Sequence, residues 1–92
     1  MKITLNENIY VAPKPKARYF RQALQIVQER DLNRLTPDML DELIQYVCDV
    51  FGSQFTLNEL YDELPSEELV PLVQETIEFE VGKQGNADGK KK

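Results

Sequence analysis

The chain has 92 residues, enough for one small domain whose single hydrophobic core gives only modest stability. It contains no histidine and a single cysteine, Cys48, so the commonest general base and metal ligand is missing and no internal disulfide can form. The net charge of −5 argues against nucleic-acid binding, and no apolar run approaches the roughly 20 residues that span a bilayer. We therefore expect an intracellular protein without a membrane segment.

Charge is divided unevenly along the chain. Residues 1–35 carry a net charge of +4, residues 36–81 hold twelve acidic and no basic residues, and residues 82–92 carry +3. A solvated acidic face would explain this division. So would electrical complementarity between two ends of the molecule, which favours head-to-tail contacts between subunits.

Residues 2–11 predict a β-hairpin. Ile3 and Leu5, and then Ile9 and Val11, alternate with polar residues around the sequence NEN, whose asparagines tolerate positive φ. We expect these four apolar side chains to bury one face of the hairpin. A two-stranded hairpin is hardly stable alone, so its edges are expected to be available to another chain.

Residues 16–30 have the spacing of an amphipathic helix. Phe20, Ala23, Leu24 and Val27 form its predicted apolar stripe. Basic residues lie near the start of this helix, although the helix dipole favours acids there. That mismatch suggests that these basic residues serve a purpose other than stabilising the helix. We take them as candidate client or subunit contacts: Lys14, Lys16, Arg18 and Arg21.

Residues 37–51 predict a second helix, with Thr36 as the N-cap, Pro37 at the first position and Gly52 just past its end. Its apolar side chains cover an arc of about 200°, whereas a core-facing surface helix needs somewhat over 100°. Either the helix is central and packed on both sides, or one side of it meets a partner. For the second case the candidate contacts are Tyr46, Val50 and Phe51.

Two more helices are predicted at about residues 57–63 and 67–81. Thr56 and Glu59 have the spacing of a capping box, which marks the start of the first. Pro71 lies slightly too deep for a clean first turn of the second, so we expect a kink or an offset start there. Gly82 is expected to end this helix, and residues 83–92 to form a disordered basic tail because they lack apolar anchors.

The expected fold is therefore mainly α with an N-terminal β-hairpin, a small α+β domain over residues 1–82 with about four helices. No sequence pattern for a catalytic site, a cofactor or a metal is present. Cys48 falls on the apolar side of its helix, where a core role is more common than a nucleophilic one. We expect a protein that is not an enzyme.

Several segments, taken in order, resemble the small tail assembly chaperones of long-tailed bacteriophages (siphoviruses) of Gram-positive hosts. They are the N-terminal hairpin, the entry APKPKAR, the junction VFGSQFT and the acidic segment LPSEELVPL, and the likeness covers residues 1–82. The resemblance implies a protein that coats the tape measure protein, keeps it soluble, helps to recruit tail tube subunits and is absent from the mature virion. It also implies the host bacterial cytoplasm.

Such chaperones commonly come in two lengths, the longer made by a ribosomal frameshift, and the three final lysines are compatible with a slippery run of adenines. The expected partners are the tape measure protein, the tail tube protein and further copies of the chain, without nucleic acid or membrane. Two alternatives remain open. One is an acidic module that mimics nucleic acid, and the other is a structural head–tail connector subunit.

Overall fold

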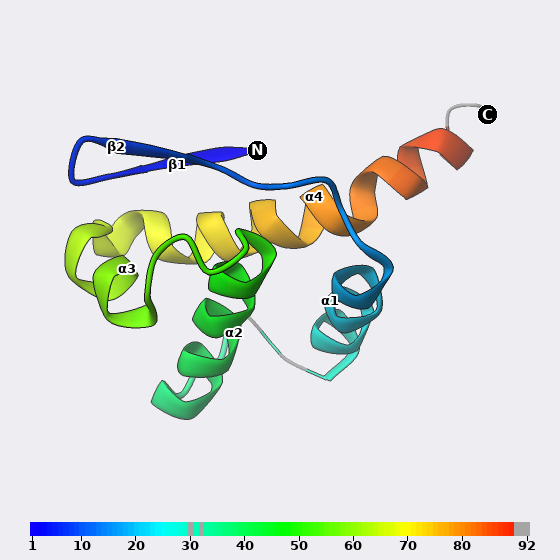
Figure 1. Ribbon diagram of the computed structural model, residues 1–92. Helices are drawn as coiled ribbons and strands as arrows, with labels where there is room; N and C mark the ends of the chain where they lie inside the picture. The colour runs from blue at the N-terminus through cyan, green and yellow to red at the C-terminus, as the bar shows by residue number, and fades with distance from the viewer. Residues whose placement is uncertain (30, 32, 90–92) are drawn as a thin grey trace.

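The computed structural model describes the backbone of residues 1–29, 31 and 33–89, and the side chains of these residues as far as Val81. A two-stranded hairpin is followed by four α-helices, which confirms the predicted fold class (Figure 1). The elements are β1 (Lys2–Leu5), β2 (Asn8–Val11), α1 (Ala17–Glu29), α2 (Pro37–Val50), α3 (Leu57–Glu63), a 3-10 turn η1 (Ser66–Glu68) and α4 (Leu69–Gly89).

The hairpin turns in two residues, not three. Asn6 and Glu7 both have positive φ, 50° and 71°, and Leu5 pairs with Asn8. Because directly paired residues point to the same face, the β2 residues that share the face of Ile3 and Leu5 are the half-buried Tyr10 and the exposed Asn8. The expectation that Ile9 and Val11 share the buried face of Ile3 and Leu5 is therefore wrong: Ile9 is 65% and Val11 58% exposed.

Helix α2 begins and ends as its caps predict. The Thr36 hydroxyl accepts a hydrogen bond from the Met39 backbone N–H at 3.2 Å. At the other end Gly52 has φ +73° and donates to the Asp49 carbonyl, while the Ser53 N–H donates to the Cys48 carbonyl, both at 2.9 Å. These two bonds form a Schellman motif, which needs a left-handed residue where the glycine stands.

The wide apolar arc of α2 is explained by burial on several sides. The helix packs against α1, α3 and α4, and Figure 1 shows it crossing beneath the long helix α4. Six of its side chains are buried, and so is Phe51, which follows the helix. The structure thus favours the central-helix interpretation that the sequence left open. The six are Leu43, Ile44, Tyr46, Val47, Cys48 and Val50.

Two local predictions for α3 and α4 are confirmed and a third is wrong. The Thr56 and Glu59 side chains make the reciprocal capping box. The turn η1 shifts the start of α4 to Leu69, which places Pro71 in the first helical turn, as the expected offset start requires. The predicted end at Gly82 is wrong, because α4 continues to Gly89; a glycine costs about 1 kcal/mol inside a helix but does not force its end.

The sequence predicts a disordered tail over residues 83–92. The backbone is instead helical as far as Gly89, and residues 90–92 lie outside the described residues. The long helix α4 projects beyond α1 at the C-terminal end of the molecule (Figure 1). Within the described part of the chain, none of the helices combines the length and the apolar character needed to cross a bilayer.

Candidate functional surfaces

The predicted basic contacts gather around the start of α1. Lys14, Lys16, Arg18 and Arg21 are all exposed, and we call them together the basic end of the molecule. Arg18 and Arg21 line a shallow hollow together with two glutamines of α1. The four cations are available for contacts with an acidic surface.

Glu80 of α4 explains how α1 tolerates basic residues at its start. Helix α1 has no acid of its own in the first turn. The Lys16 backbone N–H instead donates to Glu80 Oε1 at 3.2 Å, so a carboxylate from another helix lies at the positive end of the α1 dipole. Glu80 is 1% exposed, and burial raises the pKa of its carboxyl above the ordinary value, although the hydrogen bond from Lys16 opposes that rise.

Glu80 is not among the residues predicted from the sequence, although a signal for it was present. The buried positions of α4 recur every three or four residues, and extending this stripe from Val73 and Ile77 reaches Glu80. A buried acid in an apolar stripe needs a donor, and here the donor is a backbone N–H more than sixty residues away in the chain.

Tyr46 is a core residue. Its ring makes an edge-on contact with Tyr19 at 6.3 Å between centroids, and its hydroxyl donates to the Tyr19 carbonyl at 2.9 Å. Burial raises the pKa of Tyr46, and the nearby Glu80 raises it further. Val50 and Phe51 are at most 1% exposed. The expectation that Tyr46, Val50 and Phe51 face outward is wrong, because the domain itself covers both sides of α2.

Surplus apolar surface lies on α1 instead of α2. The core side of α1 consists of Tyr19, Ala23 and Ile26, of which the last two are buried. Much of the predicted stripe points outward: Leu24 is 48% and Val27 62% exposed.

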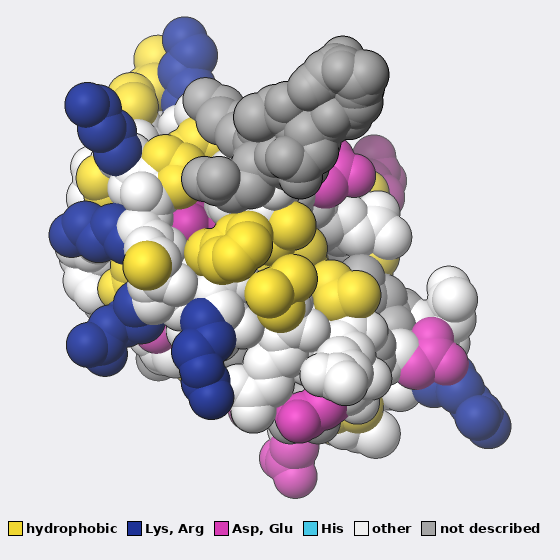
Figure 2. Space-filling view, turned by 90° about the vertical axis from the view of Figure 1, so that its right-hand side faces the viewer, with side chains coloured by type: hydrophobic (Ala, Val, Ile, Leu, Met, Phe, Trp, Pro, Cys, Tyr) yellow, Lys and Arg dark blue, Asp and Glu magenta, His cyan; other side chains and the backbone are white. Residues whose placement is uncertain are grey.

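We call the half-buried Phe20 together with Leu24 and Val27 the outward stripe. Figure 2 shows hydrophobic side chains gathered on this face of the molecule, with lysine and arginine side chains beside them.

A second exposed apolar surface is the outer face of the hairpin. Ile9 and Val11 lie there with Thr4 and Lys2, their cross-strand partners. Three of these four residues are β-branched, so they form a stiff surface on a two-stranded sheet. Together with Leu24 and Val27, Ile9 and Val11 make up the large hydrophobic side chains that are exposed among the described residues.

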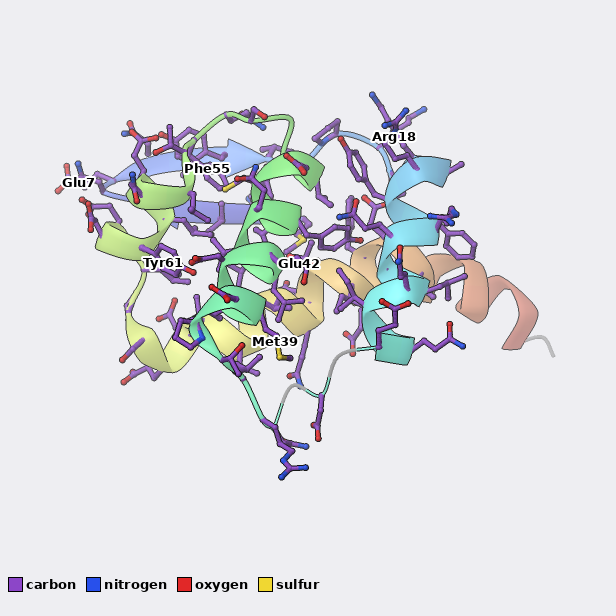
Figure 3. The ribbon with its side chains drawn as sticks, turned by 90° about the horizontal axis from the view of Figure 1, so that it is seen from below. Glu7, Arg18, Met39, Glu42, Phe55 and Tyr61 are labelled. Carbon is purple, nitrogen blue, oxygen red and sulfur yellow. The ribbon has the colours of Figure 1, made fainter. Side chains whose placement is uncertain are left out.

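Acidic residues gather at the α3 end, away from the basic end. We define the acidic end by five exposed acids: Glu7 in the hairpin turn, Asp41 in α2, and Glu59, Asp62 and Glu63 in α3. The Tyr61 hydroxyl donates to Asp41 Oδ1 at 2.6 Å, and burial together with this bond raises the pKa of Tyr61 to about 12. Figure 3 shows Glu7 and Tyr61 at one side of the molecule and Arg18 at the other.

Cys48 lies in the core, as the sequence predicts, and burial raises the pKa of its thiol to about 11. Within the described residues no group of histidine, cysteine or acidic side chains is placed to hold a metal ion.

The comparisons with known proteins give one family. The family model for phage tail chaperone proteins matches this chain over residues 1–92, which is the whole sequence. Neither the curated proteins nor the solved structures give a match.

Proposed function

This chain belongs to the phage tail chaperone family, and from that premise we propose that it binds the tape measure protein of a long-tailed phage, keeps that protein soluble and helps to recruit tail tube subunits. The observation that carries the proposal beyond the family is the exposed apolar surface. A chaperone of this kind needs apolar area that its own core does not use, and four large apolar side chains are exposed among the residues that the structure describes.

The outer face of the hairpin is the surface that we assign to the client. Thr4, Ile9 and Val11 offer a stiff patch, and the sheet has only two strands among the described residues, so a further strand can add at an edge. The apolar face of a client helix lies across this patch, or a client strand adds to an edge. Both modes use the hairpin while leaving the helical core unchanged.

The role is one of assembly rather than catalysis, and it is exercised in the host bacterial cytoplasm, without retention in the mature virion. Copies of the chain associate head to tail along the client. A longer form made by frameshifting near the three final lysines is part of the same proposal. Its test is the nucleotide sequence of the last codons: lysine codons without a run of adenines, or the lack of an overlapping downstream frame, would remove it.

Co-expression with the tape measure protein of the same phage tests the main function. The tape measure protein is expected to be insoluble alone and soluble with the wild-type chain. The double variant Ile9→Thr/Val11→Thr keeps β-branched side chains but removes apolar area, so it should fold normally and lower the soluble fraction of the client. Val70→Thr, the same kind of change at a half-buried position of α4 that belongs to neither the hairpin nor the outward stripe, is the matched control.

Two results would contradict the proposal. If the tape measure protein stays insoluble in the presence of the wild-type chain, the client is another protein. If the hairpin variant solubilises the client as well as the wild type does, the hairpin is not the client surface. A chain recovered in stoichiometric amounts from purified virions would point instead to a structural connector.

A further inference from the structure

We propose that copies of this chain join through one specific pair of surfaces, the outward stripe of α1 on one copy and the acidic end on the next. The inference names the contacts of the proposed head-to-tail association. It rests on the proposed function only for the role of the assembly, which is to line the client. Both surfaces belong to this chain, so the contact can be tested without a client.

The outward stripe is the first half of the contact. At 100° per residue, the core side of α1 and the outward stripe join into one apolar arc of about 160°, of which the domain covers only part. Phe20, Leu24 and Val27 follow the i, i+4, i+7 spacing of a helix that packs against another helix. A helix at the rim of a small domain thus presents a second packing face to an external partner.

Charge selects the partner for this face. Arg21 lies three residues before Leu24 and borders the outward stripe, so two outward stripes facing each other would bring the Arg21 side chains of both copies together. The outer face of the hairpin is also unfavourable, because it carries Lys2 beside Ile9 and Val11. The acidic end has the complementary charge, and none of the residues 36–81 is basic.

The acidic end also supplies apolar contacts with matching spacing. Leu57, Tyr61 and Leu64 of the α3 region are half-buried and repeat the i, i+4, i+7 spacing of the outward stripe. Exposed acids flank them, among them Asp62 and Glu63. The apolar ridge of one copy can therefore meet the apolar stripe of the next while acids meet Arg21 at the rim.

The two elements that carry these surfaces lie on opposite sides of the molecule, since Figure 3 places α1, marked by Arg18, at one side and Tyr61 of α3 at the other. A contact between two different surfaces leaves one of each free, and further copies then add into a ring or an open helix. The patches are small, so we expect a weak association that salt disrupts, because rim charge pairs are screened over about 8 Å at physiological ionic strength.

Sedimentation velocity of three variants tests the contact. Leu24→Gln/Val27→Gln removes the outward stripe but keeps residues that favour helix. Asp62→Lys/Glu63→Lys reverses the charge of the acidic end. Glu75→Lys/Glu78→Lys makes the same change in net charge at exposed positions of α4 and is the matched control. Circular dichroism checks that each variant is folded.

The wild type and the α4 control should form species larger than a dimer at low salt and shrink at high salt. The stripe variant and the acidic-end variant should each be monomeric under the same conditions. Mixed in equal amounts, they should form a dimer and nothing larger, because the stripe variant keeps its acidic end and the acidic-end variant keeps its stripe. This result is specific to a contact between unlike surfaces.

The proposal is overturned if the wild type is monomeric at every concentration and salt, if either surface variant associates like the wild type, or if the mixture stays monomeric. The α4 control losing association together with the acidic-end variant would also overturn it, because net charge alone would then be the cause. Since no client is present, failure here leaves the co-expression test of the proposed function untouched.

Discussion

Replacing Tyr46 measures how much of the stability of the domain depends on the inner side of α2. Tyr46→Phe removes only the hydroxyl that donates to the Tyr19 carbonyl at 2.9 Å and leaves the ring contact in place. Tyr46→Ala also removes the ring from a site that is 0% exposed. The pair of variants therefore separates the hydrogen bond from the packing.

The expected costs follow from these contacts. Loss of one buried hydrogen bond costs about 1 kcal/mol, which in a domain of this size lowers the melting temperature by about 4–8 °C. Truncating a buried aromatic residue to alanine costs about 3–5 kcal/mol because it leaves a cavity. Since small domains have a total stability of about 5–15 kcal/mol, Tyr46→Ala should bring the chain close to unfolding.

Urea unfolding followed by far-ultraviolet circular dichroism gives both values. Tyr61→Phe is the matched control, because it removes a tyrosine hydroxyl whose bond to Asp41 lies at the surface, and it should cost less than Tyr46→Phe. A cost of less than about 1 kcal/mol for Tyr46→Ala would refute the reasoning. Tyr46 would then not be a core residue, and α2 would again be a candidate partner surface.

Three further predictions concern single positions. Burial raises the pKa of Glu80 from the ordinary 4.5, so the native state binds this proton more tightly than the unfolded state and loses stability as the pH rises from about 4.5 through the native pKa. In urea titrations Glu80→Gln should therefore gain stability over the wild type across that pH window, and the control Glu78→Gln should not. A stability difference between Glu80→Gln and the wild type that does not change with pH would contradict this. Gly52→Ala should cost about 1–2 kcal/mol because of its positive φ, since a Cβ there meets no atom closer than 4.0 Å and steric crowding adds nothing. Gly52→Asn should cost less, because asparagine tolerates the left-handed conformation, and equal costs in thermal melts would point to another cause. Cys48, with its pKa raised to about 11, should react with a thiol reagent at pH 8 only as the chain unfolds, and rapid labelling in native buffer would show that it is accessible.

Local signals in the sequence determine where the elements begin and end. The Thr36 cap, the Thr56–Glu59 capping box and Gly52 each act within a few residues of the chain, so their positions can be read without knowledge of the fold. The helical periodicity gives the number of helices for the same reason. The prediction that α4 ends at Gly82 is wrong because a glycine permits a helix end without requiring one.

The sequence also predicts that one helix carries more apolar surface than a core-facing helix needs, but it cannot say which surplus the domain covers. Burial of α2 on several sides and exposure of Leu24 and Val27 follow from the packing of α1 and α2 against α4. The exposed face of the hairpin depended on whether its turn has two residues or three. A change of one residue reverses which side chains point inward.

The sequence by itself determined that this chain folds as a small, mostly helical domain in which an acidic segment lies between two basic ones. Only the tertiary structure decided that Glu80 lies at the start of α1 and that the basic and acidic ends lie on opposite sides of the molecule. The physical reason is the range of the interactions. Caps and periodicity act over a few residues, whereas burial, a carboxylate paired with a distant N–H, and the separation of charge depend on which helices the folded chain brings together.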